Sequence, residues 1–197
     1  MSFRKEKKFR LSKYDYDLIK NKLLINGMQP MYANRSINSL YYDTELYNML
    51  NDSEEGILPR KKVRIRWYDD ISKANKEVKI SSIEGRYKTT SLANVASVLS
   101  LPQSFYDRSY GTIHPSLLVS YNREYFSYET MRITFDSGIE YVNYRQSRCM
   151  KHTDSERVME VKVGIDVPDD YIENVLPFSN ARFSKYSRGL LITRSEL

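Results

Sequence analysis

The chain has 197 residues, with 31 Lys and Arg against 25 Asp and Glu, and therefore a net charge of +6. This length fits one domain that buries a core without disulfides, and the single cysteine, Cys149, excludes a disulfide framework or a multi-cysteine metal site. Neither a Gly-rich phosphate loop nor an apolar run of about 20 residues occurs, which excludes P-loop and membrane-spanning classes. The basic start lacks the apolar core of a secretion signal. We therefore expect a soluble, cytoplasmic protein.

Alternating hydrophobicity and helix caps divide the first half of the chain into strands and short helices. A strand over Phe3–Leu11 is followed by a helix that Ser12 caps and Gly27 closes. Its expected apolar stripe consists of Leu18, Ile19, Leu23 and Leu24. The next expected elements are a strand over Ile37–Thr44, a helix over Glu45–Asn51, a hairpin of Arg60–Tyr68 and Lys76–Ser81 turning at Asp69–Asp70, and a helix over Ser91–Leu101.

The second half repeats this pattern without a linker or a low-complexity segment. The expected elements are a hairpin of Leu117–Tyr125 and Tyr128–Phe135, strands over Ile139–Tyr144 and Glu156–Val163, a helix over Pro168–Leu176 and a last helix after Phe183. Strands dominate, with roughly eight in all and short helices between them. The sequence predicts one mainly antiparallel α+β domain over residues 1–197.

The strand Arg60–Tyr68 has four basic residues on one face and apolar residues on the other. The basic face carries Arg60, Lys62, Arg64 and Arg66, and the apolar face carries Val63, Ile65 and Trp67. A face that only meets solvent usually mixes charge signs, because stacked like charges repel. Two interpretations stay open: a solvated face, or the inner wall of a closed barrel that binds a polyanion.

Three other strands place a glutamate and a lysine two residues apart on one face. These pairs are Glu6 with Lys8, Glu77 with Lys79, and Glu160 with Lys162. Glutamates among inward cations can ligate Mg²⁺ or Mn²⁺, although Glu6 and Glu77 are equally suited to pairing with the cations. A barrel of eight strands has room for one slender ligand, such as a linear phosphate chain.

Eight segments in order resemble the VTC domain, the catalytic module of polyphosphate polymerases in the triphosphate tunnel metalloenzyme (CYTH-like) superfamily. The segments are FRKEKKF, INSLYYDT, VRIRWYD, KEVKIS, VSYNREYF, RITFD, VMEVK and RFSKYSRG, and they extend from Arg4 to Ser187. The resemblance implies an antiparallel eight-stranded β-barrel, the triphosphate tunnel, with short flanking helices. It also implies transfer of the ATP γ-phosphate onto a growing inorganic polyphosphate chain, with Mn²⁺ or Mg²⁺ required.

The resemblance also assigns roles to individual residues. The residues implied in catalysis are Arg64, Arg66, Arg123 and Lys185. The residues implied in substrate binding are Lys8, Lys79, Lys88, Arg132, Lys162 and Tyr121. Glu160 of the V-x-E-x-K segment matches the metal-binding glutamate of the family. Tyr41, Tyr42 and Tyr121 suit either core packing or stacking on an adenine, with packing favoured.

Three other functions remain as alternatives. A triphosphatase that hydrolyses inorganic or nucleoside triphosphate is disfavoured, because hydrolytic relatives open with E-x-E-x-K whereas this chain has Arg4-x-Glu6-x-Lys8. A non-catalytic polyphosphate- or nucleotide-binding module stays possible. Nucleic-acid binding fits poorly, because no nucleic-acid motif is present and inward cations would be hidden from a duplex. The expected partners are ATP and polyphosphate or triphosphate, with any membrane link supplied by other chains.

Overall fold

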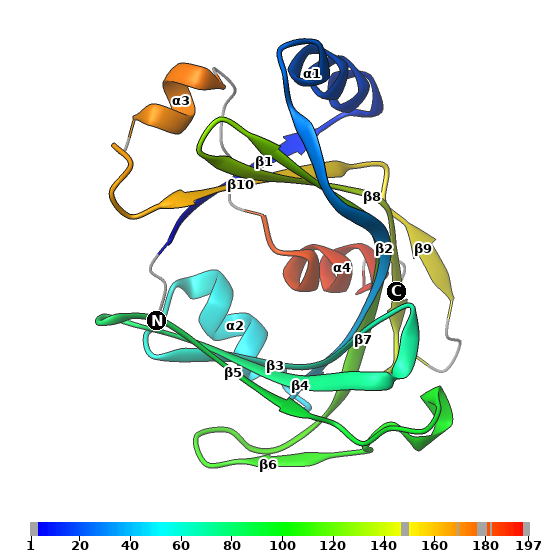
Figure 1. Ribbon diagram of the computed structural model, residues 1–197. Helices are drawn as coiled ribbons and strands as arrows, with labels where there is room; N and C mark the ends of the chain where they lie inside the picture. The colour runs from blue at the N-terminus through cyan, green and yellow to red at the C-terminus, as the bar shows by residue number, and fades with distance from the viewer. Residues whose placement is uncertain (1–3, 147–149, 169, 177–180, 182, 195–197) are drawn as a thin grey trace. The chain divides into compact units, whose positions relative to one another are not determined.

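The computed structural model of the chain describes residues 4–146, 150–168, 170–176, 181 and 183–194 (Figure 1). Cys149 lies outside the described residues. The strands are β1 (Arg4–Leu11), β2 (Gln29–Asp43), β3 (Arg60–Tyr68), β4 (Asp70–Ser82), β5 (Gly85–Leu92), β6 (Phe105–Asp107), β7 (Gly111–Tyr128), β8 (Met131–Asn143), β9 (Lys151–Thr153) and β10 (Arg157–Gly164). The helices are α1 (Lys13–Ile25), α2 (Asn48–Glu55), the 3₁₀ turn η1 (Val98–Ser100), α3 (Tyr171–Val175) and α4 (Lys185–Arg194).

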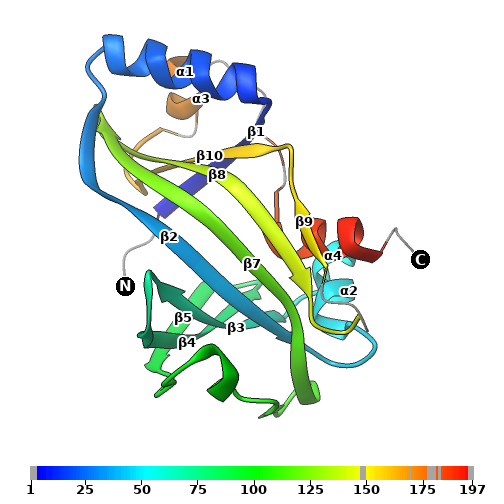
Figure 2. The same ribbon diagram turned by 90° about the vertical axis from the view of Figure 1, so that its right-hand side faces the viewer.

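Eight strands follow one another in the sheet in the order β1-β10-β8-β7-β2-β3-β4-β5, with β6 paired to β7 and β9 paired to β8. The pairings β1–β10, β10–β8, β2–β3, β3–β4 and β4–β5 are all antiparallel. The long strands β2, β7 and β8 lie side by side, as Figure 2 shows. The predicted α+β fold with an antiparallel eight-stranded sheet and short helices is confirmed. Among the helices of the described ranges, none is long and apolar enough to cross a membrane.

The chain separates into two compact units. Unit 1 comprises residues 1–35, 121–139 and 153–183, and unit 2 comprises residues 36–120, 140–152 and 184–197. The strands β2, β7 and β8 each pass from one unit to the other, because the boundaries 35/36, 120/121 and 139/140 fall inside them. The expectation of a single domain over residues 1–197 stays a prediction.

In unit 1, α1 and α3 cover the apolar face of β1, β10 and β8 (Figure 1). Ser12 begins α1 by accepting a hydrogen bond from the backbone N–H of Asp15, as expected. The core beneath the helices contains Phe9, Tyr16, Ile19, Leu23, Ile133, Phe135, Met159 and Val161. Because side chains alternate along a strand, the opposite face of the same strands carries Lys8, Arg132 and Glu160.

In unit 2, the predicted apolar face of β3 is buried. Val63, Ile65 and Trp67 pack with Leu40, Tyr42, Met49 and Val95 in one cluster. The hairpin of β3 and β4 is confirmed, with Asp69 in the left-handed conformation at its turn (φ 46°). The basic residues at positions 60, 62, 64 and 66 therefore share the other face of β3, as the sequence predicts.

Helix α4 packs so closely in unit 2 that one position accepts only glycine. A Cβ atom built on Gly189 would lie 2.6 Å from Leu117 Cδ2 and closer still to the Tyr141 ring. We expect Gly189→Ala to lower the free energy of unfolding by about 1–3 kcal/mol through overpacking, measured by urea denaturation. Gly164→Ala is the matched control, because no atom lies within 4 Å of its added Cβ and its change should stay below about 0.5 kcal/mol. Equal effects at the two positions would contradict this account.

Several boundaries predicted from the sequence are wrong. The segment Ser91–Leu101 is not a helix, because Leu92 ends β5, which pairs with β4, and only Val98–Ser100 form a helical turn. In α1, Leu18 is 53% exposed whereas Tyr16 is buried, so the buried stripe is shifted from the predicted one. The segment Ile139–Tyr144 is not a separate strand, since it continues β8 to Asn143. The short strands β6 and β9 carry no clear alternation and were not predicted.

Candidate functional site

The polar face of unit 2 is organised around the buried carboxylate of Glu77, which is 5% exposed. Arg64 lies directly opposite Glu77 across the β3–β4 pair and donates through Nε to its Oε2 at 2.7 Å. Arg66 Nη1 lies 3.9 Å from the same oxygen, and Lys88 of β5 pairs with Oε1. Burial alone raises the pKa of Glu77, but Arg64, Arg66 and Lys88 outweigh burial and lower the pKa to about 2. Glu77 is therefore ionised at neutral pH.

Polar side chains on the same face fix the cations in place. Arg66 Nε donates to Ser39 Oγ at 2.9 Å, and Lys62 Nζ donates to Ser184 Oγ at 3.0 Å. Ser184 immediately precedes Lys185, the first residue of α4. The contact between Lys62 and Ser184 brings the start of α4, where Lys185 lies, to the polar face of β3.

Tyr41 of β2 links the cations to α4. Its hydroxyl accepts a hydrogen bond of 2.9 Å from Arg64 Nη1, and its ring stacks on that of Tyr186, with centroids 4.7 Å apart. Tyr186 in turn donates to Asp43 Oδ2 at 2.6 Å. Burial alone raises the pKa of the Tyr41 phenol, but Arg64, Arg66 and Lys62 outweigh burial and lower it to about 7.

The phenol of Tyr41 should titrate near neutral pH. Between about pH 6 and pH 8, the tyrosinate absorbance of the wild type should increase by the amount that one ionised tyrosine contributes. In Tyr41→Phe, this increase should be absent. The pKa of Tyr41 in the folded protein lies below the ordinary value of 10.0, so the ionised phenol stabilises the folded state. This stabilisation is fully present above pH 10 and is lost as the pH falls through about 7. Tyr42→Phe is the control, since Tyr42 lies on the opposite face and donates to Pro102 O. An unchanged titration in Tyr41→Phe would contradict the assignment.

The polar face of unit 1 is organised around Glu160 of β10, which is 8% exposed. Lys162 Nζ lies 2.6 Å from Glu160 Oε1, and Arg123 Nη2 lies 3.8 Å from Oε2. Lys8 lies directly opposite Glu160 on β1 and pairs with Glu6 at 3.3 Å. Burial alone raises the pKa of Glu160, but Arg123, Lys162 and Lys8 outweigh burial and hold the pKa well below its usual range. Glu160 is therefore a permanent anion among cations.

Arg123 of β7 is fixed by a second carboxylate. Its Nε and Nη2 donate to Asp136 Oδ1 and Oδ2 at 2.5 and 2.7 Å, and Asp136 is fully buried. This two-point geometry orients the guanidinium more firmly than a single contact would. Tyr121, also buried, places its ring 5.3 Å from the Arg123 guanidinium. The ring therefore supports the guanidinium of Arg123, and its burial favours the packing interpretation over stacking on an adenine.

Two side chains on the same face of β8, two residues apart, have polar atoms with no hydrogen-bond partner in the described part of the chain. These atoms are Arg132 Nε and Thr134 Oγ1, and both are buried. Thr134 lies directly opposite Glu160, and Arg132 lies directly opposite Lys162. Buried polar atoms are rarely left without a partner in folded proteins. Both side chains border the cations around Glu160, so the polar face of unit 1 contains hydrogen-bonding groups that no described residue uses.

The donor set at Glu160 fits a divalent cation that a ligand helps to hold. An ionised carboxylate oxygen and the hydroxyl of Thr134 are the hard ligands that Mg²⁺ and Mn²⁺ prefer. Lys162 and Arg123 already contact the carboxylate, so further oxygen ligands must come from the bound molecule. Among the described residues, no group of three or more His, Cys, Asp or Glu is placed to hold a metal on its own.

The structure gathers the residues predicted from the sequence into these two clusters. Unit 1 holds Lys8, Tyr121, Arg123, Arg132, Glu160 and Lys162. Unit 2 holds Arg64, Arg66, Lys79, Lys88 and Lys185, with Lys79 opposite both Lys62 and Lys88 in the strand register. Glu77 pairs with cations, one of the two roles left open for it. Sequence reasoning missed Ser39, Asp136 and the link from Tyr41 to Arg64, although strand parity already places the first two on the polar faces.

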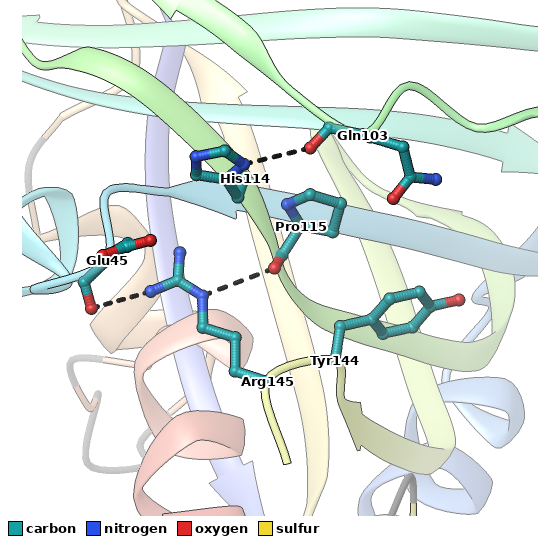
Figure 3. A pocket seen from close by; sticks show the side chains of 6 residues that line it. All are labelled: Glu45, Gln103, His114, Pro115, Tyr144 and Arg145. Atoms are coloured by element: carbon teal, nitrogen blue, oxygen red, sulfur yellow. Dashed lines mark hydrogen bonds between the residues drawn. The ribbon is translucent and has the colours of Figure 1, made fainter. Parts of the chain in front are cut away.

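A pocket of about 460 Å³ lies elsewhere in unit 2, lined by Glu45, Gln103, His114, Pro115, Tyr144 and Arg145 (Figure 3). Arg145 donates to the backbone oxygens of Thr44, Glu45 and Asp43 at 2.7 to 2.9 Å. His114 Nδ1 lies 3.3 Å from Gln103 O. Because its arginine is engaged with the backbone, this pocket offers little to an anion, and it contains none of the predicted site residues.

Comparison of the sequence with models of known families shows which family the chain belongs to. The profile of the VTC domain matches residues 3–100 and 84–194. The chain belongs to the VTC domain family. The resemblance to the VTC domain drawn from the eight segments is thereby confirmed. Among curated proteins, a sequence search returns no match.

Solved structures similar to this VTC domain share its fold at low sequence identity. A conserved hypothetical protein of Pyrococcus furiosus superposes with a TM-score of 0.57 at 12% identity, over 93% of this chain and 99% of that chain. The PH1819 protein of Pyrococcus horikoshii OT3 gives a TM-score of 0.54 at 14% identity, over 98% of each chain. HpAC1 of Hippeastrum, an adenylyl cyclase candidate with a dominant triphosphatase activity, gives 0.52 at 14% identity, over 98% of this chain and 96% of that chain. At these sequence identities, the similarity is one of fold.

Proposed function

We propose that this VTC domain is a polyphosphate polymerase that transfers the γ-phosphate of ATP onto a growing inorganic polyphosphate chain. The observation that carries the proposal is the charge on the polar face of unit 2. Glu77 pairs with Arg64, Arg66 and Lys88, and the same face of β3 and β4 also carries Lys62 and Lys79. The face therefore suits a chain of phosphates, which carries a negative charge on each unit.

The contacts that hold the cations support phosphoryl transfer in particular. This reaction requires mainly alignment of the reacting groups and neutralisation of charge on the transferred phosphoryl group. Arg64 is oriented by Glu77 and Tyr41, Arg66 by Ser39, and Arg123 by Asp136. Cations fixed before the substrate binds need no reorganisation during the reaction.

In the proposed reaction, an oxygen of the terminal phosphate of polyphosphate attacks the γ-phosphorus of ATP. A new P–O bond forms, the bond from the γ-phosphorus to the β,γ-bridging oxygen breaks, and ADP leaves with the electron pair. We assign stabilisation of phosphate charge during the transfer to Arg64, Arg66 and Lys185 of unit 2 and to Arg123 of unit 1. We assign substrate binding to Lys8, Lys79, Lys88, Arg132 and Lys162, with Tyr121 supporting Arg123. Glu160 would hold Mn²⁺ or Mg²⁺, which supplies further charge neutralisation at the phosphate oxygens.

A triphosphatase is the second candidate, because two carboxylates approach Lys162. Glu160 lies 2.6 Å and Glu6 lies 3.7 Å from its Nζ, so two acidic groups flank this part of the face. In that reaction water replaces the polyphosphate oxygen and inorganic phosphate is released. A module that binds polyphosphate without turnover is the third candidate. The cytoplasmic location and the absence of nucleic-acid partners stay predictions.

One incubation distinguishes these functions. Purified protein is incubated with ATP and Mn²⁺, and in parallel with Mg²⁺, and the products are separated by gel electrophoresis and nucleotide chromatography. The polymerase should produce long phosphate chains and ADP in matching amounts. Free phosphate without chains would identify a triphosphatase, and unchanged ATP would identify a binding module. Either of these two results overturns the proposal.

A further inference from the structure

Two tyrosines and two arginines of unit 1 form a further cluster beside that of Glu160. Of these four residues, only Arg132 has a role in the proposed function. Tyr32 of β2 and Tyr125 of β7 meet edge to face, with ring centroids 5.8 Å apart. The Arg132 guanidinium lies 5.6 Å from both ring centroids, and the Arg35 guanidinium lies 6.0 Å from Tyr32 and 5.6 Å from Tyr125. We call these four residues the Tyr32 cluster.

Packing that stabilises the strands accounts for Tyr125, but it does not account for the exposed ring of Tyr32 or for Arg132. Tyr125 is 5% exposed and packs as a core residue would. Tyr32 is 50% exposed, so a large part of an aromatic ring faces solvent beside two cations. Arg132 Nε is buried and has no hydrogen-bond partner among the described residues. An exposed ring and an unused donor in one cluster are features of a surface that accepts a ligand.

The Tyr32 cluster adjoins the cations around Glu160. Arg132 belongs to both groups of residues, because it lies directly opposite Lys162 in the β8–β10 register. Lys162 contacts Glu160 and Glu6, and Lys8 lies on the next strand of the same face. A ligand that reaches from Tyr32 to Lys162 would therefore combine an aromatic group at one end with several negative charges at the other.

We propose that the exposed ring of Tyr32 stacks on the base of a nucleoside triphosphate whose phosphates bind the cations around Arg132 and Lys162. The inference rests on the proposed function, since it needs phosphates on the polar face of unit 1. Aromatic rings and guanidinium groups stack on any base, so the platform selects nucleotides as a class and does not distinguish adenine from guanine. Inorganic triphosphate and polyphosphate contain no base and would bind the cations without using Tyr32. Tyr32 would therefore contact the nucleotide donor and would not contact the phosphate chain.

The test compares ATP with inorganic tripolyphosphate, which share a triphosphate and differ in the nucleoside. Dissociation constants of both are measured by calorimetry for the wild type, Tyr32→Ala, Tyr32→Trp and Tyr14→Ala. Tyr14 is the matched control, since it is 74% exposed on α1, the helix that covers the opposite face of unit 1. We expect Tyr32→Ala to weaken ATP binding about 10-fold and tripolyphosphate binding less than about 2-fold. Tyr32→Trp should retain ATP binding, and ATP, but not tripolyphosphate, should quench the fluorescence of the added indole.

Each other outcome is decisive. Equal losses for ATP and tripolyphosphate in Tyr32→Ala would overturn the stacking role, because they would mean that Tyr32 supports the phosphate cations. No loss for either ligand would overturn it too, while leaving the proposed polymerase intact. If the wild type binds neither ligand, the proposed function fails and this inference fails with it. Should Tyr32→Ala not fold, the absence of ATP-specific quenching in Tyr32→Trp would overturn the inference.

Discussion

Glu160→Gln should lower metal-dependent turnover of ATP at least about 100-fold while leaving the fold intact. The substitution keeps the shape of the side chain and removes the negative charge that pairs with Lys162 and Arg123. If Glu160 holds the metal, the neutral amide will bind it far more weakly. Turnover is measured at increasing Mn²⁺, and the far-ultraviolet circular dichroism spectrum reports whether the fold is kept.

The control for this substitution is Glu156→Gln. Glu156 precedes the same strand and pairs with Arg10, yet its side chain is 23% exposed and lies outside the Glu160 cluster. It should retain turnover within about 2-fold, since exposed ion pairs contribute little. Full activity of Glu160→Gln, or equal losses in the two variants, would contradict the assignment of the metal to Glu160.

Arg123→Met should lower the free energy of unfolding by about 3–5 kcal/mol, because it removes one partner of a buried ion pair. Asp136 is fully buried and gives both carboxylate oxygens to Arg123, so the substitution leaves an uncompensated buried charge. The double variant Arg123→Met with Asp136→Asn should recover most of the loss. The free energy of unfolding of the wild type, Arg123→Met and the double variant is measured by urea denaturation near neutral pH.

The matched control is Lys20→Met, which breaks the ion pair of Lys20 with Glu124 in the same unit. That pair is partly exposed, with side-chain exposures of 23% and 21%, and its loss should cost only about 0–1 kcal/mol. A loss for Arg123→Met no greater than that for Lys20→Met would contradict the account. So would a double variant that is less stable than Arg123→Met alone.

Strand parity was predictable because it is a local property of the sequence. Side chains of a strand alternate between two faces, so the order of Val63, Arg64, Ile65 and Arg66 already separates a core face from a basic face. The structure confirms that separation, with the apolar residues in one buried cluster and the arginines around Glu77. The pattern of acidic and basic residues on β10 indicated the Glu160 cluster in the same way.

Contacts between distant parts of the chain were harder to predict. Ser91–Leu101 has the apolar spacing of a helix, but its first residues complete the ladder between β4 and β5, and Leu99 is 94% exposed. The partners of Tyr41 come from β3 and α4, more than 20 residues away along the chain, and no local pattern identifies them. The sequence therefore indicated which residues share a face, and the structure adds which of them touch.

The low pKa of Tyr41 has a consequence for the uptake of protons. Arg64, Arg66 and Lys62 lower that pKa to about 7 by stabilising the phenolate. A polyanion bound to the same cations would offset their field, so the pKa of Tyr41 would rise towards its ordinary value and the phenolate would take up a proton. Ligand binding near pH 8 should then be accompanied by proton uptake, seen as a dependence of the calorimetric heat on the ionisation enthalpy of the buffer. In Tyr41→Phe this part of the heat should vanish.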